Sequence, residues 1–385
     1  MFEESPNTKE SIGHFTRVFG QYLAPLGHAR VLNINSAGCP FPPSSGIYVM
    51  PSREFKSKLS DHAQKFFSRN RYLDLSGDET LHGLKEAYGQ EVQGLKFDYL
   101  VNLHGKCVMI DESNLTFEAM NTRSRYRLLA TLSKLYSDGY ADYKSEIGSF
   151  RLWGRISFVF NVVSELFAKT ENVIRLTTLG QRSLIAYGWL KDEEKVHIRE
   201  NYRKYGALKP KIRLDEPYTR TIKNMGEYRG ELTSLAKDYA ILGVRNLSET
   251  LEIVEAIASS NARFNFRNYL CDDDIKIVRM LRGYNINPHR TTFVMVVGFL
   301  KEGRSFRDIC HLLGKPYPTY KSTISHYKRL AEDRGLLDYG IERPEWWREV
   351  EGVRRLDESD LPLSKKKQSA VYTRLEPPAG EVESV

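Results

Sequence analysis

Lys56 and Ser57 follow a short apolar run, residues 46–50, and a turn, and they begin a stretch with apolar residues at helical spacing. Where a strand leads into a helix in this way, the first N–H groups and the helix dipole face an anion. Lysine then meets the β- and γ-phosphates of a nucleotide, and serine holds Mg²⁺. Of the loop pattern G-x-x-x-x-G-K-[ST], only Lys56 and Ser57 match, because Met50 and Phe55 stand in the places of the two glycines. The pair predicts a phosphate site, and an ordinary helix that starts with Lys-Ser is the alternative.

Further polar residues follow two later apolar runs. Asp111 and Glu112 come directly after the run at residues 107–110, where Asp111 would bind Mg²⁺ and Glu112 would activate water. Asn161 ends the next apolar run and would position that water, with a strand-end cap as the alternative. Arg182, in the segment LGQR, would neutralise γ-phosphate charge in its own or a neighbouring subunit, with a surface arginine as the alternative.

The elements that must position these residues alternate in type along the chain. Short β-rich runs are expected at residues 46–50, 100–103, 107–110 and 154–161, and helices at residues 56–67 and 125–136. This alternation predicts a three-layer α/β domain with a largely parallel sheet, which runs from residue 46 to about residue 190. Residues 1–45 are interpreted as a mixed N-terminal lead-in, which ends in CPFPPSSG, where three prolines and a glycine break regular structure.

The order of the Lys-Ser loop, VMIDE, GRISFVFN and LGQR resembles the AAA+ branch of the P-loop ATPases. Within that branch it is most similar to minichromosome-maintenance helicases and to helicase-like proteins of phages, plasmids and integrated elements. The resemblance covers about residues 40–285. It implies a three-layer P-loop core over residues 46–190 and an all-α lid over residues 191–287. It also implies ATP and Mg²⁺ as cofactors and a ring, either of identical subunits or with another ATPase.

Two more residues become candidates through this resemblance. The stretch SSNARFNFRNYLCDDDIKIV is similar to the lid of these helicases, so Arg263 is a candidate second phosphate sensor, with a lid-surface arginine as the alternative. Residues 137–144 lie where these helicases carry a hairpin that touches DNA. Lys144 would bind the DNA backbone there, and Tyr140 and Tyr143 would stack on bases, with an exposed loop as the alternative.

The C-terminal part favours DNA binding. Helices are expected at residues 290–300, 305–313 and 319–334, the second capped by Ser305, and the pattern resembles a winged helix-turn-helix domain over residues 288–343. The residues expected to contact DNA from the third helix are Tyr320, Lys321, Ser322, Ser325, His326, Lys328 and Arg329. A helical bundle that binds protein is the alternative. Residues 344–385, rich in Pro, Glu, Ser and Lys, are expected to be disordered.

Composition narrows the class of protein without choosing a function. The chain has 57 Lys+Arg against 49 Asp+Glu, a net charge of +8 that permits an acidic partner such as DNA. Its four cysteines form no C-x-x-C pair, and no apolar stretch reaches the roughly 18 residues of a membrane span. These counts predict a cytoplasmic protein, and the resemblance implies a DNA-associated ATPase of a replication or mobile-element system. A DNA-binding regulator without enzymatic activity, or an inactive ring partner, is the alternative.

Overall fold

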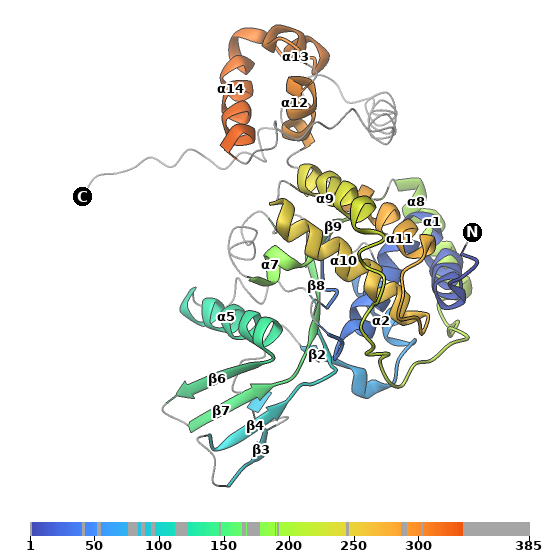
Figure 1. Cartoon of the computed structure of the whole chain (residues 1–385). Coiled ribbons are helices and arrows are strands. Elements are labelled where there is room, and N and C mark those ends of the chain that lie inside the picture. Colours follow the sequence, from blue (N-terminus) through green and yellow to red (C-terminus); the bar gives the residue numbers. More distant parts are fainter. Residues whose placement is uncertain are drawn as a thin grey trace. The chain divides into compact units, whose positions relative to one another are not determined.

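The structure is a computed structural model, shown in Figure 1. It describes residues 2–40, 43–51, 55–75, 84–85, 89–93, 97–111, 122–145, 148–163, 167, 178–188, 190, 192–243, 246–285, 291–301 and 303–333. The chain forms two compact units, Met1–Met295 and Val296–Val385. Glu112, the wing expected after the third C-terminal helix, and residues 344–385 lie outside the described residues.

The first unit is built on a five-stranded sheet. Its strands are β1 (Gly46–Met50), β2 (Tyr72–Leu75), β5 (Cys107–Ile110), β8 (Ser157–Val163) and β9 (Leu184–Tyr187). They lie in the order β2-β5-β8-β1-β9, and every neighbouring pair is parallel. The residues of β1, β5, β8 and β9 are all buried, as expected for parallel strands covered on both faces. The predicted α/β class with a parallel sheet is thus confirmed.

A second, mixed sheet contains strands that the sequence analysis did not distinguish from those of the parallel sheet. Its strands are β3 (Gly89–Glu91), β4 (Tyr99–Asn102), β6 (Tyr140–Ser145) and β7 (Gly148–Trp153), in the order β3-β4-β7-β6. The run expected at residues 100–103 therefore belongs to this sheet, in which β4 and β7 are parallel and β6 and β7 form an antiparallel hairpin.

Helices cover both faces of the parallel sheet (Figure 1). The helices of the first unit are α1 (Pro6–Ser36), α2 (Lys56–Gln64), α5 (Thr122–Asp138), α7 (Thr178–Arg182), α8 (Asp192–Tyr205), α9 (Arg229–Gly243), α10 (Leu247–Phe264) and α11 (Asp272–Arg282), with short 3₁₀ turns at Arg69–Arg71 and Gly283–Asn285. One apolar cluster packs α1, α2 and the helices from α8 onward on one face. The other packs α5, α7 and the second sheet on the opposite face.

The N-terminal lead-in contains a long helix that the sequence did not indicate. Residues Pro6–Ser36 form α1, with a kink at Gly20 (φ 78°), and most of its second half is buried. Gly13, Gly20 and Pro25 conceal the helix in the sequence, because glycine and proline disfavour a helix interior. Gly27 lies too close to Phe15 for any side chain, because a β-carbon at this position would be 2.2 Å from Cδ1 of Phe15.

The second unit contains three described helices: α12 (Thr291–Lys301), α13 (Phe306–Leu312) and α14 (Tyr317–Asp333). Ser305 caps α13 as expected, since its Oγ accepts from the N–H of Asp308 at 3.2 Å. Gly314 (φ 63°) ends α13 in the left-handed conformation that glycine favours, and α14 packs Ile324 inward. Among the described residues of the whole chain, no helix is long and apolar enough to cross a membrane.

Candidate functional site

The carboxyl edge of the parallel sheet brings three predicted residues together. Lys56 begins α2, directly after the loop from β1, and Asp111 follows the last residue of β5. Ile110 pairs with Phe160 of β8, so Asp111 lies beside Asn161, the residue that follows Phe160. This edge is where ligands bind in open α/β sheets.

Lys56 is buried, and its ammonium folds back over the loop that precedes it. Nζ donates to the carbonyl oxygens of Pro51 (3.0 Å) and Met50 (3.4 Å). Phe55, in the place of the second loop glycine, has φ 61° and is therefore in the left-handed region. The loop thus requires the glycine-like conformation although the side chain is phenylalanine.

The ring of Phe55 explains how the loop tolerates this residue. The ring lies 6.2 Å from that of Phe19 in α1 and 6.4 Å from that of Tyr202 in α8. These contacts anchor the start of α2 to the helical layer. Ser57, the next residue after Lys56, is half-buried in the first turn of α2.

Asn161 joins α2 to Asp111. Its Nδ2 donates to Oδ1 of Asp111 at 3.1 Å and to Oγ of Ser60 at 2.9 Å. Asn161 is buried, whereas Asp111 is exposed and presents its carboxylate to solvent. The sequence placed Asn161 at the end of its strand, but β8 continues to Val163, so the amide lies within the strand rather than at a strand-end cap.

Arg30 of α1 is a residue of this site that the sequence did not indicate. Nη2 donates to Oδ1 of Asn161 at 3.0 Å, and Nη1 donates to the Leu26 carbonyl at 3.0 Å. The guanidinium lies 3.7 Å from the centre of the Tyr48 ring. Burial lowers the pKa of Arg30 to about 10, against the opposing effects of Tyr48 and Asp111, so it remains a cation at neutral pH. No motif marks it, because it lies inside the helix that glycine and proline conceal.

Arg182 and Arg263 are not brought into contact with this cluster. Arg182, at the end of α7, is paired with Glu252 of α10 (3.0 Å). Arg263 is buried at the end of α10, with Nε donating to the Arg220 carbonyl and the guanidinium near Cys39. Cys39 precedes β1, so Arg263 lies toward the amino edge of the sheet, opposite Lys56, and not on the lid surface.

The expected DNA-contacting residues lie on exposed elements. Lys144 is exposed in β6, a strand rather than a loop. On α14 the side chains of Lys321, Ser322, His326, Lys328 and Arg329 are exposed, and those of Tyr320 and Ser325 are half-buried. Lys328 is within 3.6 Å of Glu332 on the next turn. The candidate residues of α14 therefore form a solvent-facing stripe.

The carboxyl edge offers a cation, a carboxylate and the N–H groups of a helix start, which are the groups that bind a phosphate and its metal ion. The described residues hold no cluster of three or more His, Cys, Asp or Glu side chains arranged to bind a metal by themselves.

Fold and site together define an α/β protein with a parallel five-stranded sheet, a mixed second sheet and C-terminal helices. No model of a protein family matches the chain, and a comparison with curated proteins likewise finds no match.

Proposed function

We propose that this protein is a DNA-associated ATPase of the AAA+ type from a replication or mobile-element system. The observation that carries the proposal is the hydrogen bond between Asn161 and Asp111 beside the first turn of α2, with Lys56 folded over its loop. Motifs that are far apart in the sequence meet at the edge of the sheet where a nucleotide would lie.

Each residue has a role in this proposal. Lys56 and the N–H groups of α2 hold the β- and γ-phosphates, and Ser57 and Asp111 hold Mg²⁺. Glu112 accepts a proton from the attacking water, and the Asn161 amide orients that water. When bound, Mg²⁺ supplies charge neutralisation of the phosphates.

The proposal places DNA on α14 and on Lys144. The exposed basic side chains of α14 contact phosphates, and its polar side chains reach base edges. Subunits assemble in a ring, of one kind or together with another ATPase, and Arg182 leaves Glu252 to reach the γ-phosphate of a neighbour. ATP binding or hydrolysis would then alter how the protein holds or remodels DNA.

Calorimetric titration of the full chain with Mg·ATP tests the nucleotide site. Lys56→Ala should weaken binding by about tenfold or more, because it removes a charge-assisted hydrogen bond to phosphate. Lys58→Ala is the matched control: Lys58 is on the same helix but is exposed and paired with Asp61 (3.3 Å). Absence of binding by the wild type, or equal affinities of the two variants, contradicts the proposal.

A second candidate is a DNA-binding regulator without ATPase activity. The ion pair between Arg182 and Glu252 favours it, because this arginine is engaged within its own chain. That candidate predicts the same DNA affinity with and without ATP, and loss of DNA binding when residues 288–385 are deleted. An ATP-dependent change in DNA affinity argues against it.

A further inference from the structure

Phe266 is an exposed aromatic residue in a backbone conformation that suits glycine. Its φ is 57°, and 53% of the residue is exposed. It follows the C-cap of α10: the N–H of Phe266 donates to the Arg263 carbonyl (2.9 Å), and the N–H of Arg267 donates to the Ala262 carbonyl (2.9 Å). In this type of helix ending the left-handed position is usually glycine.

The fold gains little from a phenylalanine at this position. Phe55 is also left-handed, but its ring packs against the buried Phe19 of α1 and the half-buried Tyr202 of α8. Among the described residues, the ring of Phe266 makes an edge-on contact with that of Tyr218 at 6.2 Å, and the residue is largely exposed. A strained, exposed residue that does not stabilise the core points to a role in binding.

Aromatic and cationic side chains gather around Phe266. Tyr269 is 45% exposed, three residues further along the same loop. The N–H of Lys223 donates to the Asn268 carbonyl (2.8 Å), which ties the segment of Tyr218 to this loop. We call Tyr218, Arg220, Lys223, Phe266 and Tyr269 the Phe266 surface.

The two cations of the Phe266 surface are available to an anionic partner. Arg220 and Lys223 are both exposed, and the Arg220 guanidinium lies 5.7 Å from the centre of the Tyr218 ring. Within the part of the chain that the structure describes, neither forms an ion pair with a carboxylate. Their charge is therefore not neutralised by the protein.

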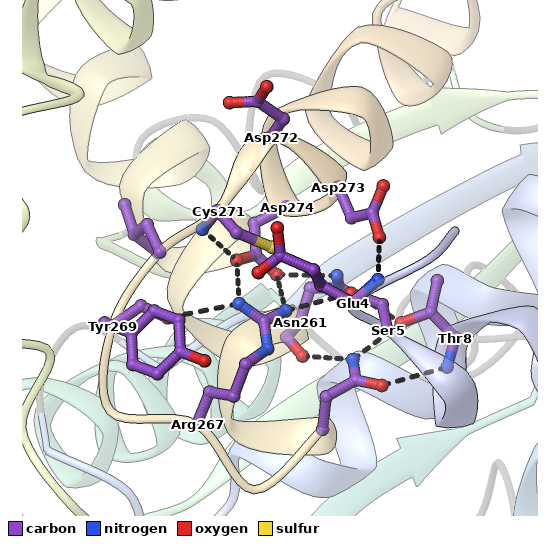
Figure 2. A network of polar contacts seen from close by, with 12 residues as sticks. Glu4, Ser5, Thr8, Asn261, Arg267, Tyr269, Cys271, Asp272, Asp273 and Asp274 are labelled. Atoms are coloured by element: carbon purple, nitrogen blue, oxygen red, sulfur yellow. Dashed lines mark hydrogen bonds and ion pairs between the residues drawn. The ribbon is translucent and has the colours of Figure 1, made fainter. Parts of the chain in front are cut away.

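A buried polar network holds this loop in place (Figure 2). Arg267 donates to both carboxylate oxygens of Asp274, at 2.8 and 2.9 Å, and to the Tyr269 carbonyl. Asn261 donates to the same carboxylate at 2.8 Å. Since the loop is fixed before any partner arrives, binding loses little conformational freedom.

The Phe266 surface is separate from the nucleotide site. Pro217, next to Tyr218, lies near Gly38: a β-carbon on Gly38 would be 3.7 Å from Cγ of Pro217 and 3.1 Å from Cα of Gly105, which lies just before β5. The surface therefore lies toward the amino edge of the sheet, whereas Lys56 and Asp111 lie at the carboxyl edge.

We propose that the Phe266 surface binds single-stranded nucleic acid. Bases stack on the exposed rings of Phe266 and Tyr269, and Arg220 and Lys223 bind the phosphates between them. The combination favours a single strand over a duplex, because the faces of paired bases are covered by their neighbours. This proposal goes beyond the proposed ATPase, since it needs neither the nucleotide site nor the C-terminal helices.

The test uses the full chain and a fluorescent oligothymidylate of about 15 nucleotides, with affinity measured by fluorescence polarisation over a range of salt concentrations. Phe266→Gly should weaken binding about tenfold at every salt concentration, because a base can no longer stack on the ring. The same variant should unfold at an equal or higher temperature than the wild type, because glycine relieves the left-handed strain. Val196→Ala, at another exposed apolar position on α8, should change neither property.

The cations give a second, independent readout. The variant with Arg220→Ala and Lys223→Ala should reduce the slope of log affinity against log salt by about 0.7 for each phosphate that the protein no longer neutralises. Lys58→Ala should leave the slope unchanged.

Equal oligothymidylate affinity of wild type and Phe266→Gly, or an unchanged salt slope in the double variant, overturns the proposal. No binding of the oligonucleotide by the wild type also overturns it and would assign the surface to a protein partner. Mg·ATP affinity serves as the separate measure of the proposed function. If the wild type binds oligothymidylate through Phe266 but does not bind ATP, the result supports the nucleic-acid proposal and rejects the proposed nucleotide site.

Discussion

Arg30 and Asn161 are 131 positions apart in the chain, yet Nη2 of Arg30 donates to Oδ1 of Asn161 over 3.0 Å. Because the amide oxygen is engaged by Arg30, the amide nitrogen of Asn161 faces Asp111 and Ser60. A cation buried in the first helix thus sets the orientation of a polar group at the candidate site.

Arg30→Ala should lower the free energy of unfolding by about 2–6 kcal/mol, since two buried acceptors each lose a donor at about 1–3 kcal/mol. Urea unfolding measures the change. Arg17→Ala removes an exposed arginine of the same helix and should cost about 0.5 kcal/mol or less. Equal stabilities of the two variants would show that Arg30 does not fix Asn161.

Acidification should destabilise the first unit through three buried histidines. Burial is the largest cause in each case, and it lowers the pKa of His14 to about 4, of His62 to about 3 and of His28 to about 4. Each is neutral in the folded protein but takes up a proton near pH 6.5 when unfolded. The free energy of unfolding is therefore unaffected by these histidines above pH 6.5, and it decreases as the pH falls from 6.5 toward 4.

Unfolding in urea at pH 7, 6 and 5 checks this dependence. Below pH 6.5 each histidine should contribute a slope of up to about 1.4 kcal/mol per pH unit. His62→Gln, which removes the contact of 3.0 Å between the His14 and His62 rings, should make the dependence shallower. A pH dependence as steep as that of the wild type would rule out a contribution from His62.

Asp274→Asn should destabilise the protein by about 3–5 kcal/mol, because it leaves the buried guanidinium of Arg267 without its counter-charge. Asp61→Asn breaks the exposed pair with Lys58 and should cost about 1 kcal/mol or less. Thermal or urea unfolding of both variants separates the two cases. Similar losses for both would contradict the role of Asp274 in holding the loop of Figure 2.

Phe55→Gly should raise the affinity for Mg·ATP severalfold, because glycine has no β-carbon and permits closer approach of a phosphate to the backbone. Glycine also suits the backbone conformation at this position, where φ is 61°. Calorimetry measures the change, and Phe19→Leu, which alters the ring packed against Phe55, is the control. Unchanged affinity in Phe55→Gly would mean that the phenylalanine does not restrict the site.

The parts predicted from the sequence are those with a local signal. Apolar runs of β-rich residues located β1, β5 and β8, and the candidate residues Asp111 and Asn161 at these runs are in contact in the structure. Ser305 located the start of α13 because a cap is read from one or two residues. These features depend on neighbours in the chain, so a single sequence carries them.

The missed features depend on contacts between distant segments. The helical character of α1 is hidden by Gly20 and Pro25, and it comes from burial against the sheet and α10. Arg30 carries no local pattern, since its role is defined by Asn161 in β8. The strand β4 looked like a member of the main sheet because its residues do not reveal which strand it pairs with.

The most direct measurement of the central claim is the Mg²⁺ dependence of ATP binding by wild type and Asp111→Asn. Asp74→Asn, on the neighbouring strand β2, is the control, since Asp74 is engaged with Gln64 and Arg69. Mg²⁺ should increase the ATP affinity of the wild type and of Asp74→Asn, and should have little effect on Asp111→Asn, which lacks the carboxylate proposed to bind the metal. The same gain from Mg²⁺ in all three proteins, or no ATP binding by the wild type, would contradict a nucleotide site built on Lys56, Asp111 and Asn161.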